Sequence, residues 1–129
     1  NSGGIIMKKL IMGLFLTLSI MAVAGEKYDY VEDRLELKYT TLTDSKKNSL
    51  KIDDIDMGVF NNHIYVNMEV EAFSGDGGWG KFDKTSYDEI AKTIADDVRK
   101  MLNVNDKVEI TLLLEREIGK DMMLHNGLY

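Results

Sequence analysis

The sequence predicts an α+β fold: an antiparallel sheet of four to five strands with one amphipathic helix packed on one face, in the order β-β-β-α-β-β, preceded by a signal peptide. Three observations support this prediction. Short segments on both sides of the chain's middle alternate between apolar and polar residues, as half-buried strands do. One longer segment between them repeats apolar residues every three or four positions, and residues 7–24 have the layout of an export signal.

The first alternating segment is RLELKYTTLT, in which Leu35, Leu37 and Tyr39 fall on one side. Because a period of two is typical of a strand, we expect a strand from about Asp33 to Thr43. The residues before it, EKYDYVED, fit either a helical turn or an extended lead-in. The polar segment that follows it, TDSKKNS, predicts a turn.

Two further alternating runs, IDMGVF and HIYVNMEVEAF, are separated by Asn61-Asn62, a pair that tolerates the left-handed backbone of a tight hairpin. One face of this hairpin is apolar and the other is polar, which predicts a sheet that is covered on one side only. The apolar face holds Ile55, Met57, Val59, Ile64, Val66, Met68 and Val70, and the polar face holds Asp56, Tyr65, Asn67, Glu69 and Glu71.

The predicted helix is SYDEIAKTIADDVRKMLN. Ser86 followed by Glu89 predicts a capping box at its start, and Asn103 is expected to end it. After it, KVEITLLLERE alternates again, and MMLHN returns as a last strand after a turn at residues 118–121. The apolar stripe of the helix consists of Tyr87, Ile90, Ala91, Ile94, Ala95, Val98, Met101 and Leu102, and that of the next strand consists of Val108, Ile110, Leu112 and Leu114.

Composition excludes several classes of function. The chain has 129 residues and no cysteine, so disulfides, thiolate metal sites and cysteine nucleophiles are excluded. Its formal charge is −6; Lys8 and Lys9 are two of its 16 basic residues and no acid precedes Gly25, so residues 25–129 hold 14 basic and 22 acidic residues, a net charge of −8. Such a surface repels phosphate backbones and anionic lipids, which disfavours binding to nucleic acid or to membranes by the mature domain.

Residues 7–24 predict a secretory signal peptide. Two lysines follow Met7, an apolar run extends from Leu10 to Val23, and small residues stand at Ala22 and Ala24. We expect cleavage near Ala24 and an exported protein, periplasmic or secreted. The alternative is a retained anchor, although the apolar run is shorter than the roughly twenty residues that span a bilayer.

Residues 1–6, NSGGII, precede the first methionine. Gly3-Gly4 can be encoded by GGA-GGA, a purine-rich ribosome-binding sequence at the usual short distance from the Met7 codon. We interpret this segment as untranslated leader read into the open frame, or alternatively as an expression scar. The domain organisation is therefore residues 1–6, a signal peptide at 7–24 and a single small α+β domain at 25–129.

The loop SGDGGWGKFD is the most unusual stretch of the mature domain. Gly75, Gly77 and Gly80 match G-x-G-x-x-G, but the next helix is predicted to begin only at Ser86, and Asp76 would repel a phosphate. Phosphate binding is therefore disfavoured. The same loop suits recognition, because an indole such as that of Trp79 can stack on a sugar or anchor a protein partner. A lid over the core is the alternative role for Trp79.

The remaining candidates for chemistry are weak. Asp53, Asp54 and Asp56 are close in sequence, as are Asp76 and Asp83, but neither set has the spacing of a helix-loop-helix calcium site. In a regular strand Asp53 points away from the other two, so a solvated surface is favoured. The only histidines, His63 and His125, lack zinc-binding spacing, and the serines lie in turns or at a helix start. We expect no catalytic residues, no metal and no cofactor.

The sequence thus predicts a small, exported, non-catalytic binding module of the cell envelope or exterior. It would engage a protein or peptide through the polar sheet face, an unpaired edge strand or the glycine-rich loop. The alternative is a calcium- or glycan-binding domain, or a small hydrolase, that uses the loop around Trp79. The candidate binding residues are Trp79, Asp76, Phe82, Tyr65 and Glu69.

Overall fold

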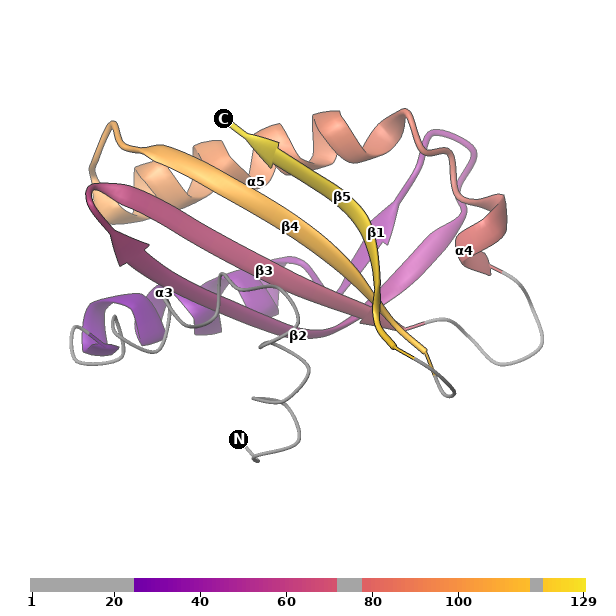
Figure 1. Cartoon of the computed structure of the whole chain (residues 1–129), viewed down its shortest axis with the longest axis horizontal. Helices are drawn as coiled ribbons and strands as arrows, with labels where there is room; N and C mark the ends of the chain where they lie inside the picture. Colours follow the sequence, from indigo (N-terminus) through magenta and orange to yellow (C-terminus); the bar gives the residue numbers. More distant parts are fainter. Residues whose placement is uncertain (1–24, 72–77, 117–119) are drawn as a thin grey trace.

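The computed structural model of the chain describes residues 25–71, 78–116 and 120–129. They form an α+β fold built on one five-stranded sheet in the order β1-β2-β3-β4-β5 (Figure 1). The predicted signal peptide, residues 1–6 and Asp76 lie outside the described residues. Among the described residues, no helix is long and apolar enough to cross a membrane. The elements are α3 (Gly25–Lys38), β1 (Thr41–Thr43), β2 (Ser49–Phe60), β3 (His63–Glu71), α4 (Gly78–Lys81), α5 (Ser86–Leu102), β4 (Lys107–Glu115) and β5 (Met122–Leu128).

The sheet is mixed, so the prediction of an antiparallel sheet is wrong in one place. β3 and β4 run parallel, with Ile64 beside Val108 and Val70 beside Leu114, whereas all other neighbouring strands are antiparallel. The connection between β3 and β4 passes through α5, and a crossover helix returns the chain to its starting end. Alternation within a strand carries no information about this direction.

The hairpin between β2 and β3 confirms the prediction from the sequence. Asn61 and Asn62 have positive φ angles of 52° and 59°, which a two-residue hairpin turn requires. The register places Met57 opposite Val66 and Ile55 opposite Met68. The apolar side of this hairpin therefore enters the core as one continuous surface.

Helix α5 confirms the predicted apolar stripe, since Ala91, Ile94, Ala95 and Val98 are fully buried. Its end is also confirmed, because Asn103 adopts the left-handed conformation and its N–H donates to the Lys100 carbonyl at 3.3 Å.

The predicted capping box at the start of α5 is wrong. The residue at the N-cap is Thr85, its backbone is already helical, and its side chain makes no capping bond. Asp83 supplies local support instead, because its Oδ1 accepts hydrogen bonds from the Thr85 N–H at 3.0 Å and from the Thr85 hydroxyl at 2.7 Å. Ser86 consequently lies inside the helix.

The predicted strand from Asp33 to Thr43 is also wrong over most of its length. Residues up to Lys38 belong to α3, and only Thr41–Thr43 form a strand. Val31 and Leu35, four positions apart, are buried together, whereas Leu37 is 80% exposed. The spacing of four from Val31 decides the structure here, and the helical alternative for EKYDYVED is the correct one.

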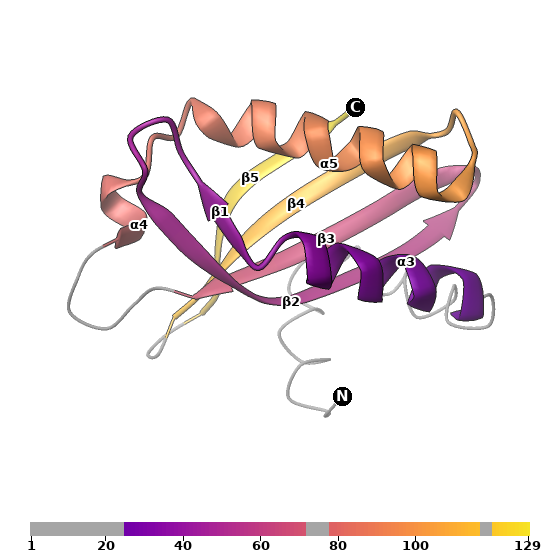
Figure 2. The ribbon, with the colours of Figure 1, turned by 180° about the vertical axis from the view of Figure 1, so that it is seen from behind.

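Both long helices cover the same side of the sheet (Figure 2). α5 crosses the sheet and α3 lies along β2. The end of α3 is held to α5, because Lys38 Nζ lies 2.7 Å from Asp97 Oδ2 and the Tyr39 hydroxyl donates to the same carboxylate. The core therefore sits between the sheet and the two helices, and none of the described helices lies on the opposite face of the sheet.

Candidate functional site

The face of the sheet that no described helix covers, called the helix-free face below, is strongly acidic. Side chains that alternate with the core residues of β2, β3 and β4 point to this side, so Asp56, Asn67 and Thr111 form one row across the three strands. We call the surface formed by the carboxylates in these rows the acidic face. Its members are Asp53, Asp54, Asp56, Glu69, Glu71, Glu109 and Glu115.

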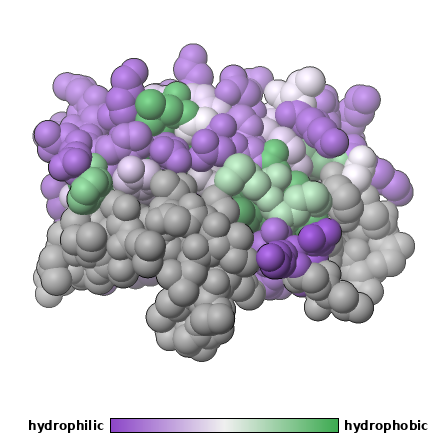
Figure 3. Space-filling view, viewed as in Figure 1, coloured by the Kyte–Doolittle hydropathy of each residue, from purple (hydrophilic) through white to green (hydrophobic). Residues whose placement is uncertain are grey.

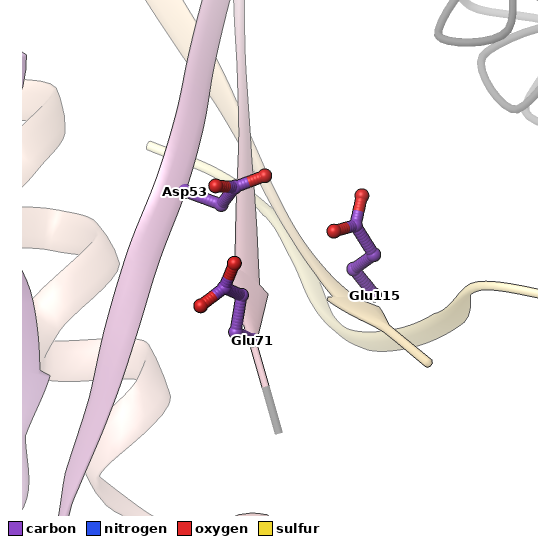
Figure 4. Close-up of side chains that lie close together, drawn as sticks. All are labelled: Asp53, Glu71 and Glu115. Carbon is purple, nitrogen blue, oxygen red and sulfur yellow. The ribbon is translucent and has the colours of Figure 1, made fainter. Parts of the chain in front are cut away.

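Three carboxylates converge at one end of the acidic face (Figure 4). One oxygen of each of Asp53, Glu71 and Glu115 lies within 4.8 Å of the others. Glu71 and Glu115 are paired at the carboxyl ends of the parallel strands β3 and β4. Lys51 Nζ, 3.9 Å from Glu71 Oε2, offsets part of this charge. Carboxylate oxygens are the ligands that Ca²⁺ prefers, so this arrangement has the donor chemistry of a divalent-cation site.

A β-bulge brings Asp53 into this group. The register of β2 against β3 shifts between Ile52 and Asp54, so Asp53 is the extra residue of the bulge. In a regular strand Asp53 would point away from the acidic face, which is what the sequence predicted. The bulge re-aims its carboxylate toward Glu71 and Glu115.

The centre of the acidic face contains a buried polar row. Asn126 Nδ2 donates to Thr111 Oγ1 and to Glu109 Oε2, both at 2.9 Å. Asn67 is only 2% exposed, and neither atom of its side-chain amide has a hydrogen-bond partner in the part of the chain that the structure describes. Buried amides are normally paired, so Asn67 is an exception among the described residues, but its burial leaves no open surface for a partner.

A histidine and a tyrosine close the other end of the acidic face. The rings of His63 and Tyr65 stack at 4.5 Å, and His63 Nε2 lies 3.2 Å from Glu109 Oε1. This contact holds the half-buried ring of Tyr65 beside the carboxylates. An aromatic ring next to acids suits contact with a positively charged side chain.

The structure brings together some of the predicted site residues but not others. Tyr65 and Glu69 both lie on β3 and face the same side, but Glu69 is only 4% exposed and Tyr65 is half-buried. Phe82 is 3% exposed and stacks on Tyr87 at 5.0 Å, so its ring belongs to the core and is not available at the surface. Trp79 lies in α4, but its side chain, like Asp76, is outside the described residues.

The sequence missed Glu115 as a site residue. Its place beside Glu71 depends on the parallel pairing of β3 and β4, which alternation does not reveal. One signal was available: Glu71 and Glu115 each stand two residues before the end of a predicted strand that is followed by a segment containing glycine. Acids at such positions meet when the two strands are neighbours and parallel.

A separate groove of about 410 Å³ lies between β1 and the start of α5. Its buried acid, Asp44, accepts hydrogen bonds from the N–H groups of Lys46, Asn48 and Asp83 and from the Asn48 side chain. Desolvation opposes ionisation, but the hydrogen bonds from Asn48, Asp83 and Lys46 outweigh it and hold the pKa of Asp44 below its usual value. The oxygens of this carboxylate already accept hydrogen bonds within the β1–β2 turn, so the acidic face is the better candidate for binding.

Comparison with known proteins adds no relative. No family model matches the chain, and neither a curated protein nor a solved structure matches it.

Proposed function

We propose that this chain is a small, exported, non-catalytic binding module whose acidic face engages a positively charged segment of an envelope or extracellular protein or peptide. The observation that supports the proposal is the concentration of carboxylates on one rigid sheet face, from Asp53 at one end to Glu109 at the other. A field of one sign steers a partner of opposite charge and raises its rate of association.

The composition of the face defines the partner. On the described strands, the lysines on the same side lie at its margins, at Lys51 and Lys107. Tyr65 is half-buried and offers an aromatic surface for a lysine or arginine stem. These features favour a basic segment whose side chains approach the acids.

The direct test is binding of a short labelled lysine-serine peptide, measured by fluorescence anisotropy beside a glutamate-serine peptide of equal length. We expect only the lysine peptide to bind, and its affinity to fall at least tenfold between about 20 mM and about 300 mM salt, as exposed ion pairs are screened. Equal binding of both peptides, or of neither, would contradict the proposal.

A matched pair of variants localises the binding. Glu71→Gln removes one charge from the acidic face, and Glu89→Gln removes one charge from the exposed surface of α5. Both variants have the same net charge, so non-specific attraction weakens equally in both. We expect Glu71→Gln to lower the affinity several-fold more than Glu89→Gln.

The predicted export by residues 7–24 can be tested separately from binding. When residues 7–24 are fused to a reporter enzyme that is active only outside the cytoplasm, activity is expected. N-terminal sequencing of the processed protein is expected to begin at Gly25. Retention of the uncleaved chain in the membrane fraction would favour the anchor alternative.

Binding of a divalent cation is a second candidate function, favoured by the close approach of Asp53, Glu71 and Glu115. Three carboxylates can supply up to about six oxygens when each binds through both, which is the lower end of what Ca²⁺ takes. Calorimetric titration with CaCl₂ tests it: a saturable signal that disappears in Glu71→Gln and persists in Glu89→Gln supports a site. A signal that both variants share would indicate only diffuse attraction.

A further inference from the structure

β5 is an open edge of the sheet. Among the described strands it pairs only with β4. Tyr129 and Val108 exchange backbone hydrogen bonds of 2.8 and 2.9 Å, and the register continues regularly to Asn126. In an antiparallel pair alternate residues point their N–H and C=O groups to opposite sides, so those of Leu128 and Asn126 point away from β4.

This edge differs in chemistry from the rest of the sheet. β5 contains no charged side chain, whereas β2, β3 and β4 all carry acids. Met123 and Leu128 are 48% and 55% exposed. Hydrophobic surface lies along the course of β5 where the surrounding described surface is mostly hydrophilic (Figure 3, in the orientation of Figure 1). An uncharged, partly apolar edge strand is a template for pairing with another strand.

We propose that β5 of two copies pair antiparallel across a two-fold axis, so that two sheets join into one. A second copy is the occupant that β5 fits, because the strand matches itself: it is uncharged, and its outward residues Asn126 and Leu128 can pair reciprocally across a two-fold axis. The protein carries a formal charge of −6 and repels itself over most of its surface. Among the described strands longer than three residues, β5 alone carries no carboxylate that would oppose that of a second copy.

The geometry gives a self-consistent register. If the axis passes beside Gly127, Asn126 of each copy lies opposite Leu128 of the other, and their outward backbone groups bond in both directions. The two Leu128 side chains then become diagonal neighbours on the helix-free side, a separation that long side chains bridge. The two acidic faces would lie next to each other in one extended surface.

The edge strand is held in position for such pairing. The Tyr129 hydroxyl donates to Asp88 Oδ1 at 2.5 Å and lies 2.6 Å from His125 Nε2. Arg99 donates to the Tyr129 carbonyl at 2.8 Å. These contacts tie β5 to α5, so little backbone entropy remains to be lost when a partner strand adds.

Sedimentation equilibrium of the purified protein tests the proposal. One strand pair buries less than a standard interface, so we expect a reversible monomer–dimer equilibrium with a Kd of roughly 10–100 μM. Leu128→Lys places like charges across the axis and should weaken the dimer at least tenfold, whereas Leu37→Lys, at an exposed leucine of α3, should not. Added salt should leave the wild-type dimer intact, unlike the peptide binding proposed above.

Two further measurements keep the test independent of folding. An equimolar mixture of Leu128→Lys and Leu128→Glu should regain the dimer, because opposite charges then meet across the axis. Hydrogen exchange at the Asn126 and Leu128 amides should slow only at concentrations where the dimer forms.

A monomer throughout the concentration range, a dimer unaffected by Leu128→Lys, or one weakened equally by Leu37→Lys would overturn the proposal. So would exchange protection of both amides without a dimer, since another segment of the same chain would then occupy the edge. Peptide binding to the acidic face can be measured in Leu128→Lys, so the two proposals can fail separately.

Discussion

The two long edges of the sheet differ in whether their outward backbone groups have hydrogen-bond partners. Along the part of β2 that does not pair with β1, side chains of α3 accept hydrogen bonds from outward N–H groups. The Met57 N–H donates to Glu32 Oε2 at 2.7 Å, and the Ile55 N–H donates to Glu36 Oε2 at 3.4 Å. On β5, no described element bonds to the outward backbone groups. One edge is closed by the protein's own helix and the other is available to a partner.

This difference shows how a helix can replace a strand. The carboxylates of α3 stand where the carbonyl groups of another strand would be, and Val31 and Leu35 anchor the helix in the core. A covered edge resists uncontrolled pairing. Because β2 is closed in this way, β5 is the long edge of the described sheet at which we propose strand addition.

Covering the β2 edge has an electrostatic cost. The pKa of Glu32 is raised from 4.5 to about 7. Desolvation is the largest cause, the hydrogen bond from Met57 partly opposes it, and the nearby acids Asp56, Asp29 and Asp54 add to it. The closed edge is therefore sensitive to pH near neutrality. No comparable acid is built into β5.

The largest expected effect comes from removing the anchor of α3. Leu35→Ala leaves a cavity in the core and should lower the free energy of unfolding by about 2–5 kcal/mol in urea denaturation. Leu37→Ala, two residues away on the exposed side, is the control and should change it by less than about 0.5 kcal/mol. Equal effects would mean that α3 does not contribute to the core.

Hydrogen exchange compares the two edges directly. The Met57 amide, bonded to Glu32, should exchange at least about 100-fold more slowly than the Leu128 amide at a protein concentration too low for self-association. Exchange followed by NMR measures both amides in one sample. Similar rates at the two sites would show that the β2 edge is not protected.

Neutralising Glu32 separates the hydrogen bond from the charge. Because the pKa of Glu32 is higher in the folded state, its folded form binds a proton more tightly, and stability is lost as pH rises from about 4.5 to about 7. Glu32→Gln keeps an oxygen acceptor for Met57 without ionising. At pH 8 it should be about 1 kcal/mol more stable than the wild type, a value reduced for partial exposure of the carboxylate.

Denaturation of both proteins at several pH values checks this expectation. At pH 4 the stability advantage of Glu32→Gln should disappear. Glu36→Gln is the control, because its exposed side chain makes the longer bond to Ile55 and should alter the pH dependence less. An unchanged pH profile in Glu32→Gln would contradict the interpretation.

The smallest expected effect concerns the β5 edge. A Cβ on Gly127 would approach Tyr129 Oη to 2.5 Å, so Gly127→Ala should push the ring away from Asp88 and His125. We expect a loss of about 0.5–1 kcal/mol, the net value of a hydrogen bond. In a Tyr129→Ala background the same substitution should cost nothing, and thermal unfolding of the four proteins measures this coupling.

Several structural features of this protein could be predicted from the sequence alone. The hairpin at Asn61-Asn62, the apolar stripe of α5 with its end at Asn103, and the polar face that holds Tyr65 and Glu69 all follow from local properties. Asparagine tolerates the left-handed backbone wherever it stands, and periodicity reports which side of an element is buried. The export signal remains a prediction.

Only the tertiary structure decided the rest. Leu35 fits a strand or a helix equally well, and burial with Val31 against β2 selects the helix. The crossover through α5 makes β3 and β4 parallel, and a bulge turns Asp53 toward Glu71 and Glu115, so the carboxylate group arises from strand pairing. These choices depend on contacts between residues far apart in the chain, whereas a short window of sequence reports only local preference.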